Sequence, residues 1–143
     1  MTTFIVPYTD FPIPACAAFP NGRIAIRPSL VLTLVNGANR LSCYGLVDSG
    51  ADHCVFRGSF MQPLGLDPLT APIEMTSGLG SAIVPTHFCS VAIDLGVVRI
   101  PVYAGFTPGM DQLGFGFLGQ AGFFEAFKIT FDYANERFLV EVP

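Results

Sequence analysis

The segment that most constrains this chain lies at residues 46–52, where an apolar run ends at a carboxylate on a turn of small residues. Residues 44–47 are apolar with a single glycine, and Asp48-Ser49-Gly50-Ala51 follows directly. A second apolar run, residues 54–56, continues beyond the turn. A strand that ends in this way presents its acid outward from a fixed position. The tetrapeptide alone is also explained by turn chemistry, because Asp, Ser and Gly all favour turns.

Composition limits the class of protein. A chain of 143 residues suits a single domain with a real core. Hydrophobic residues make up 51% of the chain, only 13% are charged, and the mean hydropathy is +0.54. No run approaches the ~18 apolar residues of a membrane-spanning helix. So much apolar surface in such a chain indicates burial in an oligomer, in a groove, or in both.

Charge and cysteine usage exclude further classes. The formal net charge is −4 and the sequence pI about 4.8, without a basic cluster, which argues against a nucleic-acid partner. Residues 1–20 contain no Lys or Arg and are interrupted by prolines, so they do not read as a signal peptide. No metal or other cofactor is expected, because the four cysteines lack the paired spacing of metal ligands: Cys16, Cys43, Cys54 and Cys89. Without a secretory signal, reduced, buried thiols and a cytoplasmic setting are expected.

Short strands dominate the predicted secondary structure. Residues 1–21 are expected to form an extended, proline-rich arm, because proline fixes φ and removes a donor, and residues 22–143 the domain. In the domain, a strand at 29–35 turns at Asn36-Gly37, which tolerates positive φ, and returns at 40–47. Short helices are expected at 58–66 and 120–127, and further strands at 53–56, 73–76, 82–84, 87–94, 97–104, 115–118, 128–133 and 137–142.

Four features follow one another along the chain: Asp48-Ser49-Gly50-Ala51 ending a strand, Leu64-Gly65-Leu66 in a helix, a glycine-bearing hairpin at 73–86, and Phe117-Leu118-Gly119 before the C-terminal helix and strands. In this order they resemble the retropepsin-like aspartic proteases, the single-domain family of retroviral proteases and their cellular and bacterial relatives. The chain looks like a non-viral, bacterial-type member, matched over roughly residues 24–142. The resemblance implies a mainly β, closed barrel-like domain with a flap hairpin and one or two short helices, active as a homodimer.

The activity that this resemblance implies is that of an aspartic endopeptidase. Two carboxylates about 3 Å apart share one proton, so that one activates a water while the other polarises the scissile carbonyl. Because the chain has only one Asp-Ser-Gly, the second carboxylate must come from another copy across a two-fold axis. A peptide or protein substrate would bind in extended conformation under the flap. The implied residues are catalytic Asp48, loop-supporting Ser49, Gly50 and Ala51, and substrate-binding Asp52, Gly78, Leu79 and Gly80.

One pair of positions departs from the viral pattern. Viral members commonly follow the glycine of the Phe-Leu-Gly segment with an Arg that pairs with an acid near the catalytic loop. Here the next residues are Gln120 and Ala121, so Asp52 lacks that partner. Dimer packing or the substrate contacts of Asp52 are therefore expected to differ from those of the viral enzymes.

Other readings stay open. The same fold without activity would serve as a dimerisation or peptide-binding module, and the acid could be an incidental turn residue in a structural β domain. His53 and Cys54 suggest a thiol hydrolase, but neighbours on a strand point to opposite faces. Asp111 is the only other acid in a glycine-bearing loop, and no Ser/Thr-Gly follows it, which disfavours a pair of catalytic acids within one chain.

Overall fold

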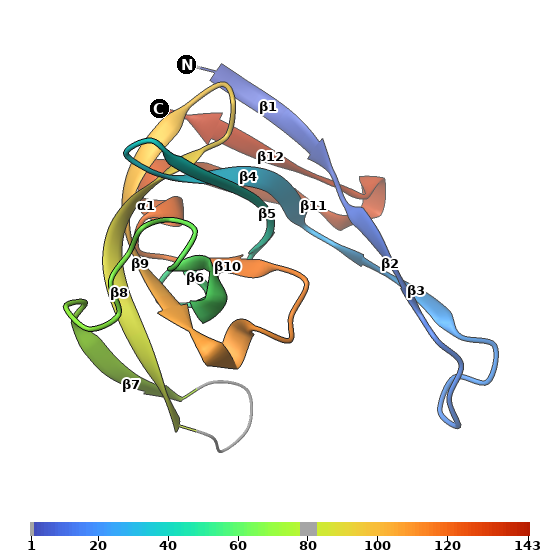
Figure 1. Cartoon of the computed structure of the whole chain (residues 1–143). Helices are drawn as coiled ribbons and strands as arrows, with labels where there is room; N and C mark the ends of the chain where they lie inside the picture. The colour runs from blue at the N-terminus through green and yellow to red at the C-terminus, as the bar shows by residue number, and fades with distance from the viewer. Residues whose placement is uncertain (1, 78–82) are drawn as a thin grey trace.

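Seven strands form one sheet that closes into a barrel. The computed structural model describes residues 2–77 and 83–143, and the sheet runs in the order β4-β5-β10-β6-β9-β8-β7 (Figure 1). Strand β4 also pairs with β8, which closes the sheet and leaves β7 as an extension. The strands are β4 (Ser29–Asn36), β5 (Asn39–Val47), β6 (Val55–Arg57), β7 (Ile73–Ser77), β8 (Ile83–Asp94), β9 (Arg99–Thr107) and β10 (Gly116–Leu118).

Alternation along β4 explains how the sequence builds this barrel. Leu30, Leu32 and Leu34 are buried, and the residues between them are more exposed, since successive side chains of a strand point to opposite faces. The strand pairs with β5 through the predicted turn, where Gly37 has φ 60°, so the expected hairpin is confirmed. Aromatic side chains fill much of the interior, and the largest that are fully buried are Phe56, Phe106, Phe123 and Phe138.

The two ends of the chain meet in a second sheet, of order β1-β12-β11. Its strands are β1 (Thr2–Pro7), β11 (Lys128–Asp132) and β12 (Arg137–Val142). Phe138 and Val140 of the central strand are buried in the same core as the barrel residues. Both edges of β12 are therefore occupied by strands of its own chain, a pairing between chain ends that the sequence pattern does not reveal.

A third sheet, of two strands, stands apart from the barrel. Strands β2 (Thr9–Ile13) and β3 (Arg23–Arg27) pair with each other, and the hairpin projects from the rest of the chain (Figure 1). Within the expected arm, Thr2–Pro7 and Thr9–Ile13 are extended as β1 and β2, but the hairpin continues to Arg27. The division of the chain at residue 21 stays a prediction.

The helix predicted at 58–66 is wrong in type and length. Only η1 (Gly58–Phe60) is helical, as a 3-10 turn, and separate hydrogen-bonded turns follow it up to residue 66. Pro63 lies in the middle of this segment and has no N–H with which to continue a helical ladder. The C-terminal helix is also shorter than predicted, with α1 at Phe123–Ala126. Among the described residues, no helix is long and apolar enough to cross a membrane.

Two strands predicted on either side of Pro85 form one long strand, β8. The register of β8 with β9 begins at His87, opposite Phe106. Pro85 therefore lies beyond the paired part of β9, where its missing N–H removes no hydrogen bond from that ladder. The sequence signal of a strand break at this proline was misleading for that reason.

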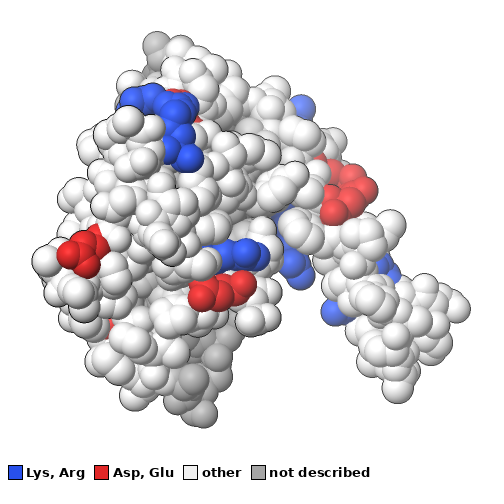
Figure 2. Space-filling view, in the orientation of Figure 1, with Lys and Arg blue, Asp and Glu red and all other residues white. Residues whose placement is uncertain are grey.

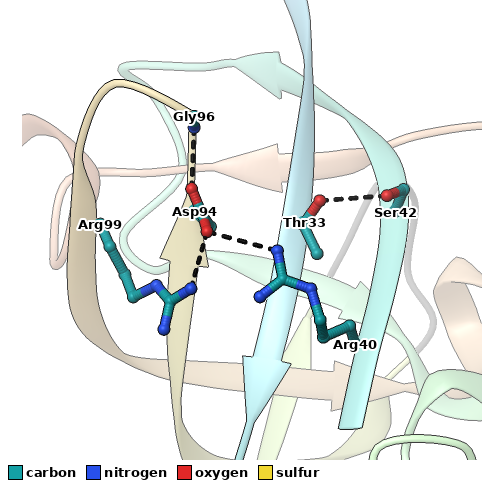
Figure 3. Close-up of polar contacts among 6 residues, drawn as sticks. All are labelled: Thr33, Arg40, Ser42, Asp94, Gly96 and Arg99. Carbon is teal, nitrogen blue, oxygen red and sulfur yellow. Dashed lines mark hydrogen bonds and ion pairs between the residues drawn. The ribbon is translucent and has the colours of Figure 1, made fainter. Parts of the chain in front are cut away.

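Asp94 links three strands close to the position where the barrel closes (Figure 3). One carboxylate oxygen accepts the N–H of Gly96 at 2.8 Å. The other lies 2.9 Å from the Arg99 guanidinium of β9 and 3.4 Å from that of Arg40 in β5. Asp94 itself pairs with Thr33 of β4 in the closing register, so this cluster connects the two ends of the sheet.

This cluster predicts a loss of stability in acid. The Gly96 N–H, followed by Arg99, holds the pKa of Asp94 below its ordinary value of 3.8. A lowered folded-state pKa contributes stability that is present above 3.8 and is lost as pH falls through the lowered value. The melting temperature of the wild type should therefore decline below about pH 4, and Asp94→Asn should flatten that decline. Glu74→Gln is the control, because Glu74 is exposed and forms none of the ion pairs among the described residues; an unchanged decline in Asp94→Asn would contradict the prediction.

Candidate active site

The Asp48 loop is fixed where it begins by the backbone hydrogen bonds of two consecutive residues. The N–H of Val47, the last residue of β5, donates to the carbonyl of Pro28 at 2.8 Å, and the N–H of Asp48 donates to the carbonyl of Leu118 at 3.0 Å. The end of β5 is thus attached through Val47 to the residue that precedes β4, and Asp48 is attached to the end of β10. The predicted strand leading into the acid is confirmed by these contacts and by β5 itself.

The loop is a turn closed by the side chain of Asp48. One carboxylate oxygen accepts the N–H of Gly50 at 2.9 Å, and the N–H of Ala51 donates to the Asp48 carbonyl at 3.2 Å. Among the described residues, the second carboxylate oxygen accepts no hydrogen bond. Asp48 is half-buried, and Ser49 and Gly50 after it are exposed. The loop therefore holds one carboxylate in a defined orientation and leaves one of its oxygens available.

Strand β10 packs next to this loop and supports it. It lies between β5, to which it is parallel with Val47 opposite Leu118, and β6, to which it is antiparallel. Gly119 then passes directly against the loop, where a Cβ atom would lie 2.6 Å from the carbonyl oxygen of Ala51 and still closer to that of His53. Only a residue without Cβ allows such an approach between two backbone segments. The Phe-Leu-Gly segment is thus part of the construction of the loop.

Gln120 adds a brace across the loop. Its side-chain amide donates to the carbonyl of Ser49 at 2.8 Å, and its backbone N–H donates to that of Ala51 at 2.8 Å. The next N–H, of Ala121, donates to the carbonyl of Asp52 at 2.9 Å. The sequence pattern marked Gln120 only as a departure from the viral enzymes. It did not predict the hydrogen bond to Ser49, because Gln120 and Ser49 are 71 residues apart in the chain.

The structure brings five of the predicted site residues together on this loop: Asp48, Ser49, Gly50, Ala51 and Asp52. The side chain of Asp52 is exposed, and none of the ion pairs among the described residues includes it. The predicted flap is present as far as its flanks, since β7 pairs with β8 from Ile73 opposite His87 to Ser77 opposite Ile83. Gly78, Leu79 and Gly80 lie outside the described residues.

Cys54, beside the loop, lies in the environment of a buried structural cysteine and not of a reactive one. Cys54 is buried, its thiol lies 3.6 Å from the Ala121 carbonyl, and burial raises its pKa. The ring of His53 packs edge-on against Phe88, with centroids 5.2 Å apart. A thiolate nucleophile needs a lowered pKa and an orienting base, and this arrangement has neither.

Asp111, the other acid in a glycine-bearing loop, makes a structural contact, because its carboxylate accepts the N–H of Ser59 at 3.2 Å.

Comparison with known proteins identifies this architecture. No protein-family model and no curated protein sequence matches the chain. Among solved structures, a retropepsin-like aspartic protease from Rickettsia conorii matches with a TM-score of 0.62 and 14% identity, over 97% of this chain and 98% of that one. An EIAV protease in complex with an inhibitor matches with a TM-score of 0.46 and 20% identity, over 66% of this chain and 82% of that one. By its near-complete match to the first of these structures, the chain has the fold of the retropepsin-like aspartic proteases.

Proposed function

We propose that this protein is an aspartic endopeptidase whose active site forms between two copies of the chain, each contributing Asp48. The observation that carries the proposal is the anchored carboxylate with one available oxygen, set on a glycine-supported loop in a retropepsin-like fold. The chain contains only one Asp-Ser-Gly. The shared site is therefore proposed on a two-fold axis beside this loop.

The two carboxylates would act on a single water. Like charges about 3 Å apart cannot both ionise, so the pair holds one proton. The ionised Asp48 takes a proton from the water as it attacks the scissile carbonyl carbon, and the protonated Asp48 of the other copy donates to the carbonyl oxygen. The pair titrates as a unit, and no covalent intermediate with the enzyme is required.

The loop contacts support specific roles for the residues around Asp48. Ser49 and Gly50 are exposed next to the carboxylate, so Ser49 is proposed to brace the loops across the axis and Gly50 to let the backbone approach substrate. An extended peptide would lie between this loop and the β7–β8 hairpin, in contact with Asp52. The assignment of Gly78, Leu79 and Gly80 to substrate binding is proposed from the sequence alone.

A dilution experiment tests the proposal. Cleavage of extended peptides is measured between pH 3 and 8, roughly the span for a carboxylate pair, and at the optimum over a range of chain concentrations. The specific activity should fall on dilution with the same midpoint as dimer dissociation measured by sedimentation. Full specific activity in a stable monomer would contradict the shared site. A dimer that binds extended peptides without cutting them at any pH would indicate the binding module instead.

A further inference from the structure

The hairpin of β2 and β3, residues 9–27, has no described partner strand outside itself, and we call it the hairpin arm. An isolated two-stranded hairpin is marginally stable in water at best. Figure 2 shows the arm standing clear of the body, with a hollow between them. A segment of this kind is more stable when a further surface covers it.

The arm exposes apolar side chains that such a surface would bury. Ile24 is 64% exposed and Phe19 is 42% exposed, and Pro12, Pro14 and Pro20 add further apolar area. Arg23 stacks on the Phe19 ring at 4.1 Å, and none of the ion pairs among the described residues includes it. Large apolar side chains are also exposed on the body, as at Leu69, but those on the arm lie on an element that stands clear of the body, where a second surface could cover them.

The root of the arm, where Thr9 begins β2 and Arg27 ends β3, packs against the body. The hydroxyl of Ser29 donates to that of Thr9 at 2.8 Å. The guanidinium of Arg27 lies 4.7 Å from the ring of Phe11 and 5.6 Å from that of Phe115, and the two rings meet edge-on at 6.2 Å. These contacts join both strands of the arm to the body, so its direction is set by packing rather than by a free hinge.

That root lies next to the proposed active site. The carbonyl of Pro28, immediately after β3, accepts the N–H of Val47, immediately before Asp48. In the proposed function the two-fold axis passes beside Asp48. An arm that starts beside this axis and extends away from its own body is placed to contact the other copy. The strands alone span about 16 Å at roughly 3.3 Å per residue, which gives the arm a length on which a second copy could pack.

We propose that each hairpin arm packs on the body of a second copy of this chain and stabilises the dimer that completes the active site; the inference rests on the proposed function. The second copy is favoured as the occupant because the arm is continuous with the interface that two Asp48 residues require. The terminal sheet offers no free edge on β12, whose two neighbours are β1 and β11 of the same chain. The arm therefore supplies contact area that β12 cannot supply by pairing with the other copy.

The first test places a charge on the arm. Ile24→Asp should raise the dimer dissociation constant at least about tenfold in sedimentation equilibrium, because a carboxylate would have to be desolvated in the interface. The matched control is Val97→Asp, at a residue that is 69% exposed in the turn between β8 and β9, and it should change the constant less than about twofold. Equal effects of the two substitutions would overturn the proposal.

The second test needs no substitution. Cys16 is exposed at the tip of the arm, whereas burial raises the pKa of Cys43 to about 12 and also raises that of Cys54 and Cys89. A benzophenone maleimide at neutral pH should therefore label Cys16 first, since the thiolate is the reactive form. Illumination of the labelled dimer should give a covalent product of two chains, with the cross-link mapping to the body of the other copy. A dimer that yields only cross-links within one chain would overturn the proposal.

The two proposals fail in different ways. If the protein is an active dimer but Ile24→Asp dissociates no more readily than Val97→Asp, the role of the arm is wrong and the shared site stands. If the arm cross-links two chains but cleavage survives the loss of Asp48, the arm is supported as a dimer contact and the catalytic proposal is wrong. A wild type that stays monomeric at every concentration contradicts both.

Discussion

Asp48→Asn is expected to lower the cleavage of an extended peptide by at least about 10³-fold, within the range that general acid–base groups contribute. Asparagine cannot accept the proton of the attacking water, and two neutral amides cannot share a proton. The fold and the dimer should persist, because an asparagine side-chain oxygen can still accept the Gly50 N–H that closes the loop. Peptide hydrolysis, melting temperature and sedimentation measure the three properties on the same preparation.

Asp67→Asn is the matched control for this substitution. Asp67 accepts the N–H of Leu69, two residues on, at 2.9 Å, the same local contact that Asp48 makes with Gly50. It differs in lying outside the proposed site. Asp67→Asn should leave cleavage within about twofold of the wild type. An Asp48→Asn protein that retains more than a tenth of the wild-type rate would contradict the assignment of Asp48.

Gly119→Ala is expected to destabilise the fold by about 3 kcal/mol, at the upper end of the usual cost of overpacking. The added Cβ would meet the backbone carbonyl oxygens of Ala51 and His53, and neither can move without displacing the Asp48 loop. Cleavage should therefore fall together with stability. The free energy of unfolding from denaturant titration at a fixed chain concentration measures the first effect.

Gly114→Ala provides the comparison within the same part of the chain. Gly114 precedes β10, and an added Cβ there would meet no atom within 4 Å. The free energy of unfolding should change by less than about 0.5 kcal/mol, as for most exposed substitutions. If Gly119→Ala were as stable as Gly114→Ala, the close approach of β10 to the loop would not support the site as described.

How far the sequence predicts this fold depends on whether a segment has a buried face. Strand β4, in which Leu30, Leu32 and Leu34 form a buried face, was predictable from its β-rich run and from the Asn36-Gly37 turn. Strand β3 has no such face, since its hairpin leaves the body, so a period of two carries little information there. Pro63, which interrupts the predicted helix, shows the opposite case, in which a local residue outweighs the surrounding pattern.

The candidate site likewise combines residues that a local pattern predicts with contacts that it does not predict. Asp48 and its turn are local and could be predicted from seven consecutive residues, and the glycine at 119 was recognisable from the Phe-Leu-Gly segment. The amide contact from Gln120 to Ser49 and the bond from Asp48 to Leu118 join distant parts of the chain. No local pattern encodes such contacts, because they arise only when β10 is inserted between β5 and β6.

The shared active site is tested most directly by mixing subunits. A fixed amount of wild-type chain is co-refolded with an equal amount of Asp48→Asn chain, and total peptide cleavage is compared with that of the wild type refolded alone. If both Asp48 residues act in one site, random pairing leaves about half of the original activity, since mixed dimers are inactive. Activity equal to or above that of the wild type alone, with mixed dimers verified by mass spectrometry, would show that mixed dimers are active and would contradict the account.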